Sequence, residues 1–140
     1  MLRAVCLALL LALAGSPAAR AEVPPGIAML DPGVLSVRIA GSWSGEAGKG
    51  PVRLVITRGA GAGMRLFVQW VGGGAVVSTV EVGEVAAGQY SITSLNVDAG
   101  ENETAVHLGL RAPDGSEPGG GSVTLLIRTP GVAEFQSAGN

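Results

Sequence analysis

The chain has 140 residues, with 9 basic and 11 acidic side chains, 23 glycines, one cysteine and a formal net charge of −2. This mild acidity, together with only five aromatic residues, argues against nucleic-acid binding, which uses basic surfaces with interleaved aromatic side chains. A hydrophobic content of 47% and a charged content of 14% also exclude the composition of a disordered chain.

The first 21 residues, MLRAVCLALLLALAGSPAARA, have the three regions of a secretory signal peptide. Arg3 precedes an apolar run over residues 4–14, and Ala19-Arg20-Ala21 is a small-x-small cleavage site. The apolar run is about 11 residues long, whereas a membrane-spanning helix needs about 20. We therefore predict cleavage between Ala21 and Glu22 and export to the periplasm or the cell exterior, with no membrane span in the mature chain.

Cleavage would remove Cys6, the single cysteine, so the mature protein would have no disulfide and no thiol chemistry. It would also leave 7 of the 9 basic residues against all 11 acidic ones. Residues 22–33, with three prolines, predict an irregular lead-in. Residues 34–140 then predict a single β domain, held together by its core alone.

Short apolar alternations separated by glycine clusters predict about eight strands and no convincing helix. The expected strands are 34–43, 51–58, 64–71, 75–86, 89–97, 104–111, 122–128 and 132–136. Their predicted buried side chains are Leu35, Val37, Ile39, Trp43; Val52, Leu54, Ile56; Met64, Leu66, Val68, Trp70; Val76, Val80, Val82; Val106, Leu108, Leu110; and Val123, Leu125, Ile127. Residues 59–63 predict a glycine-rich hairpin turn.

The strand over 89–97 changes phase, because Tyr90 and Ile92 have one parity while Leu95 and Val97 have the other. A bulge near Thr93 or Ser94 would place all four on one face. With short links throughout, the pattern predicts an all-β fold, an antiparallel up-and-down meander closed or nearly closed into a barrel. A two-sheet β-sandwich is the alternative.

Gly41-Ser42-Trp43, on the first predicted strand, resembles the Gly-x-Trp motif of calycin-type barrels, which include lipocalins, avidins and bacterial metalloprotease-inhibitor barrels. The resemblance implies a barrel whose tryptophan closes one end. It further implies that a late arginine, here Arg128, packs across the Trp43 ring with cation–π energy of about 1 kcal/mol. Strict alternation along 122–128 instead points Arg128 away from the core.

The sequence contains few candidate catalytic or metal-binding groups. His107 alternates with buried positions and should face solvent, and Glu81 and Glu84 should face opposite sides of a strand. Oxygen-bearing side chains over residues 96–103 permit a calcium loop, and a polar hairpin turn is the alternative. Asn102 begins a glycosylation sequon, whose use depends on the host.

We therefore expect a non-catalytic binding module, with no cofactor or metal, whose partner is a small apolar ligand or a protein. The alternative is a protein-directed module, either a periplasmic protease inhibitor using residues 22–33 as a trunk or an accessory subunit of an envelope complex. The bulkiest side chains that could line a ligand pocket, or else belong to the core, are Trp43, Trp70, Met64 and Phe67.

Overall fold

A computed structural model describes residues 29–118 and 122–137. The predicted signal peptide and residues 22–28 of the lead-in lie outside this part of the chain. The elements are β1 (Val34–Gly45), β2 (Gly48–Arg58), β3 (Met64–Gly72), β4 (Ala75–Glu81), α2 (Gly83–Ala87), β5 (Ser91–Ala99), β6 (Thr104–Arg111), β7 (Val123–Ile127) and β8 (Ala133–Ser137).

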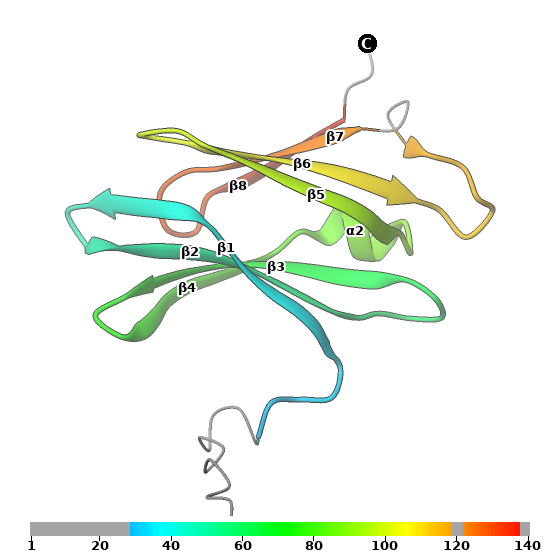
Figure 1. Ribbon diagram of the computed structural model, residues 1–140, viewed down its shortest axis with the longest axis horizontal. Helices are drawn as coiled ribbons and strands as arrows, with labels where there is room; N and C mark the ends of the chain where they lie inside the picture. Colours follow the sequence, from blue (N-terminus) through cyan, green and yellow to red (C-terminus); the bar gives the residue numbers. More distant parts are fainter. Residues whose placement is uncertain (1–28, 119–121, 138–140) are drawn as a thin grey trace, which may run out of the picture. The chain divides into compact units, whose positions relative to one another are not determined.

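The eight strands form two antiparallel meanders, β1-β2-β3-β4 and β5-β6-β7-β8 (Figure 1). The prediction of an all-β antiparallel fold with eight strands is confirmed. The described strands do not close into a barrel, and their division into two sheets agrees with the sandwich alternative. The two sheets share one core cluster of buried side chains, to which β1, β2, β3, β6 and β7 contribute.

The division into two sheets occurs at α2, where a strand over 75–86 was expected. The strand ends at Glu81, and Val82 and Val85 are both buried at 3% and 0% exposure. A spacing of three residues places side chains on one face of a helical turn, whereas it would place them on opposite faces of a strand. The helical turn lies between the sheets at one end (Figure 1), so β4 does not continue into a hairpin with β5.

The central strands follow the predicted alternation. Side chains predicted to be buried on β2, β3, β6 and β7 have exposed fractions of at most 7%, except Met64, which is partly buried. The confirmed set is Val52, Leu54, Ile56, Leu66, Val68, Trp70, Val106, Leu108, Leu110, Val123, Leu125 and Ile127. The alternation of apolar and polar residues predicts burial correctly on these strands because the other sheet covers one face of each strand.

The first strand departs from the prediction. Leu35, Val37 and Ile39 are 43%, 47% and 63% exposed, although Trp43 is 6% exposed. The pairing with β2 shifts between Ile39 and Ser42, where Gly41 has φ +89°. This irregularity reverses the inward and outward positions, so Ala40 is buried in place of Ile39. Val76, also predicted to be buried, is 45% exposed beside a similar shift between β3 and β4.

The bulge expected on β5 is confirmed. The pairing with β6 shifts between Ile92 and Ser94, leaving Thr93 as the extra residue, and Ile92 faces Leu110 while Leu95 faces Leu108. Gly109 makes the bulge possible, since a methyl group at this position would collide with the hydroxyl groups of Thr93 and Ser94. The glycine-rich hairpin is confirmed as well, with the Gly59 N–H donating to the Gly63 carbonyl at 2.9 Å.

Replacing Gly41 with alanine should lower the free energy of unfolding by about 1 to 3 kcal/mol. The backbone at +89° disfavours a side chain, and the added methyl group would lie 2.8 Å from Oγ1 of the buried Thr104. Urea denaturation measures the loss. Gly45→Ala is the matched control on the same strand, because nothing lies within 4 Å of its added methyl group. Equal stability of the two variants would contradict this account of β1.

Candidate functional site

The four side chains singled out from the sequence do not meet in one place. Trp43 and Trp70 belong to the buried core, and Met64 packs against it partly buried. Phe67 lies on the other face of β3, opposite Val55 on the outer surface of the first sheet. The Trp43 indole N–H donates to the Val71 carbonyl at 3.0 Å.

Trp70 is fully buried, and its indole connects the two sheets. Its Nε1–H donates to the backbone carbonyl of Arg128, just after β7, at 3.0 Å. Burying an indole is favourable only when its N–H finds an acceptor. Trp70 therefore acts as a structural side chain.

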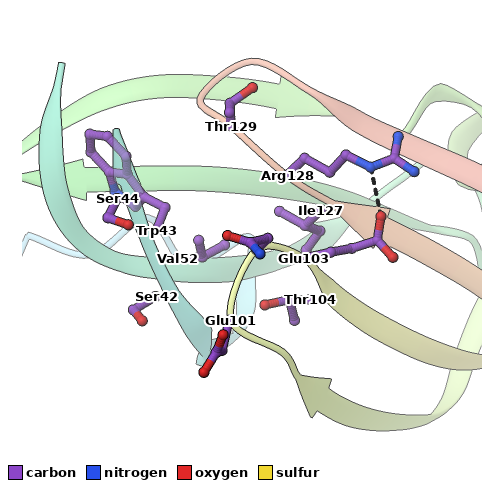
Figure 2. Close-up of a pocket in the computed structure, with 11 residues that line it drawn as sticks. Ser42, Trp43, Ser44, Val52, Glu101, Glu103, Thr104, Ile127, Arg128 and Thr129 are labelled. Atoms are coloured by element: carbon purple, nitrogen blue, oxygen red, sulfur yellow. Dashed lines mark hydrogen bonds and ion pairs between the residues drawn. The ribbon is translucent and has the colours of Figure 1, made fainter. Parts of the chain in front are cut away.

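Arg128 does not stack on Trp43 as the calycin resemblance implies. Its guanidinium binds Glu103 at 2.6 Å and Glu134 at 2.9 Å, and these two carboxylates raise its pKa. Figure 2 shows the guanidinium joined to Glu103 and well apart from the Trp43 ring. The alternation along β7, which points Arg128 away from the core, predicts this outcome correctly.

The pocket drawn in Figure 2 has a volume of about 170 Å³ and lies against the β5–β6 turn. The turn is closed by the Gly100 N–H, which donates to the Glu103 carbonyl at 2.9 Å. Glu103 is paired with Arg128, and Asn96 faces His107 across β5 and β6. No group of three or more His, Cys, Asp or Glu side chains that could hold a metal occurs in residues 29–118 and 122–137.

The remaining polar candidates are also separated. His107 is exposed, as predicted, with Nδ1 3.2 Å from Oγ1 of Thr124. Glu81 forms a two-point ion pair with Arg65, at 2.7 and 2.9 Å, while Glu84 lies on α2. Asn102 is exposed in its turn.

One open cleft combines apolar lining side chains with a single charged one. It has a volume of about 210 Å³ and lies between edge strands β1 and β5, on the side where both strands carry bulges. Its lining residues are Leu35, Ser36, Arg38, Ile56, Met64, Ile92, Thr93, Ser94 and Leu95. Of the sequence candidates, only Met64 is among them.

Met64, which lines this cleft, joins the two sheets. Its backbone N–H donates to the Tyr90 carbonyl at 2.8 Å, and its sulfur accepts from the Ile92 N–H at 3.3 Å. Arg38 faces Leu54 across β1 and β2, so its stem starts on the inner side, and it takes part in none of the ion pairs found among the described residues. Sequence reasoning missed Arg38 because it placed Val37 and Ile39 on the inner face.

Comparisons of the chain with protein-family models, curated proteins and solved structures gave no match. The calycin resemblance therefore stays a prediction. In the described part of the chain, no helix has both the length and the apolar character needed to cross a membrane.

The ion pair on the outer face makes a prediction about pH. The hydrogen bond from Arg65 lowers the pKa of Glu81 below its usual 4.5, so the pair stabilises the fold above that pH and is lost as pH falls through the lowered value. Arg65→Gln should raise the pKa of Glu81 toward 4.5, measured by NMR titration of its carboxyl carbon. Arg53→Gln is the control, since Arg53 on the next strand bonds Gln69 instead of a carboxylate. An unchanged pKa of Glu81 in Arg65→Gln would contradict the assignment.

Proposed function

We propose that this protein is an exported, non-catalytic binding module that holds one slender apolar ligand with an acidic end in the cleft between β1 and β5. The observation that supports the proposal is an open cleft with apolar walls and a guanidinium among its lining residues. The export half of the proposal is supported by the leader-like residues 1–21.

A ligand in the cleft fits the packing better than a ligand enclosed between the sheets. The centre of the sandwich is filled by the protein's own side chains, such as Trp70, Leu66 and Leu125, all with 0% exposure. The cleft is smaller than the roughly 300 Å³ at which drug-sized pockets begin. Its occupant is therefore expected to be narrow, such as an alkyl chain lying along Ile56, Met64 and Leu95.

The chemistry of the cleft indicates the polar end of the ligand. Apolar walls provide affinity without direction, whereas one charged group at a fixed position orients the ligand. Arg38 is the single charged residue among the nine that line the cleft. A guanidinium binds a carboxylate or a phosphate through two parallel hydrogen bonds, so an acidic end is the matching chemistry.

A non-catalytic role is supported by the separation of the polar candidates. Proton transfer during catalysis requires an acid or base within hydrogen-bond reach of the reacting group and of its partners. The ring of His107 contacts a threonine hydroxyl, and Glu81 is held by Arg65 on the outer surface. The protein-directed alternative remains a competing proposal, and a polypeptide co-purifying in fixed ratio from the native host would favour it.

Titration with octanoate and octanol tests the ligand chemistry. We expect octanoate to bind the protein, and Arg38→Gln to weaken octanoate binding by about fivefold, because an exposed ion pair contributes up to about 1 kcal/mol. Octanol binding should change little in this variant. Isothermal titration calorimetry measures all four affinities.

Two controls make the test specific. Arg53→Gln removes a guanidinium from the outer face of the same sheet and should leave octanoate binding unchanged. Leu95→Asn places a polar group on the apolar wall and should weaken both ligands. The absence of octanoate binding to the unmodified protein, or equal losses in the two arginine variants, would overturn the proposal.

A further inference from the structure

Strand β1 is an edge strand with apolar side chains on its exposed face. It pairs with β2 alone among the described strands. Val37 and Ile39 are 47% and 63% exposed, and both lie on the outer face of the sheet. An exposed edge offers unpaired N–H and C=O groups to another strand, and apolar side chains on that edge favour such pairing.

The apolar surface continues from the β1 edge across the outer face of the sheet. Val37 faces Val55 on β2, and Val55 faces Phe67 on β3, so these three side chains form a row across the outer face. The row ends at β4, where Phe67 faces Glu81, and the Glu81 carboxylate forms an ion pair with Arg65. The row is therefore closed by a charge on the β4 side and open on the β1 side.

The residues of the edge are complementary to a second copy of themselves. The pairing of β1 with β2 is regular over Ser36–Ile39, between the two shifts. Two copies can pair antiparallel in two registers that keep the outer faces of both sheets on the same side. The two-fold axis passes through Val37 in one register and through Arg38 in the other. The register centred on Arg38 sets two guanidinium groups directly opposite each other, which is destabilising. The register centred on Val37 sets Arg38 opposite Ser36 and joins the two apolar rows.

We propose that two copies of this chain associate through their β1 edges, antiparallel, with Val37 facing its own copy at the two-fold axis. This inference does not rest on the proposed ligand. The flanking shifts limit the pairing to a few residues, so the interface is smaller than the about 1,200 to 2,000 Å² of stable complexes. The dimer is consequently weak and dependent on concentration, and because the contact is isologous it closes after two copies.

Analytical ultracentrifugation of the exported protein, from micromolar to millimolar concentration, tests association. The unmodified protein should shift from monomer toward dimer. Val37→Lys should remain monomeric, because it sets two ammonium groups opposite each other at the axis. Val76→Lys is the matched control, since Val76 is 45% exposed on β4, the other edge of the same sheet, and it should leave the shift unchanged.

Disulfide trapping tests the register. Single cysteines are placed in a chain carrying Cys6→Ser, which removes the native thiol. In Val37→Cys the two Cα atoms would be about 4.5 to 5.5 Å apart, within disulfide range, so mild oxidation should give a covalent dimer. In Ile39→Cys the two positions would be about 13 Å apart along the strands and should not cross-link.

Several results would overturn the proposal. One is a monomer at every concentration tested. Others are equal cross-linking of the two cysteine variants, or a mixed disulfide between positions 37 and 39, which belongs to the register centred on Arg38. Melting temperatures of all variants, measured alongside, separate lost association from lost folding. Octanoate titration at a low protein concentration, where the chain is monomeric, tests ligand binding independently of association. A failure of the dimer proposal is therefore distinguishable from a failure of the proposed function.

Discussion

The fold depends on one apolar layer shared by two sheets, because neither four-stranded sheet can bury its inner face without the other. The chain has one cysteine, so no internal disulfide can hold the sheets together. Trp70 fills the layer, and its indole N–H binds the Arg128 carbonyl, which fixes β3 relative to the end of β7. Side-chain packing and this buried hydrogen bond therefore hold the two sheets together, whereas many small secreted domains use disulfides for this.

The sequence was informative on the four strands that have neighbours on both sides, and on the edge strand β5. On β2, β3, β6 and β7 the alternation predicted the buried side chains, and on β5 the phase change predicted the bulge near Thr93. It failed on β1, where a single glycine at positive φ reverses the pattern without a change in residue type. It also failed at residues 82–86, because Val82 and Val85 fit a helical turn only once the sheet is known to end at Glu81.

The same local effects explain why the candidate site was only partly predictable. Large side chains such as Trp43 and Trp70 are conspicuous in a sequence, but size alone does not separate a ligand contact from the core. The cleft lies between β1 and β5 beside their bulges, and residues from opposite halves of the chain line it. Arg38 could have been placed there from the sequence if the reversal at Gly41 had been recognised.

The two tryptophans, which are the only ones in the chain, have a consequence for spectroscopy. Both are buried, both donate an indole hydrogen bond to a backbone carbonyl, and neither lines the cleft between β1 and β5. Their emission should therefore report on water reaching the core and stay insensitive to a molecule bound in the cleft. Intrinsic fluorescence is thus an optical probe of unfolding in this protein, and a silent fluorescence titration is compatible with an occupied cleft.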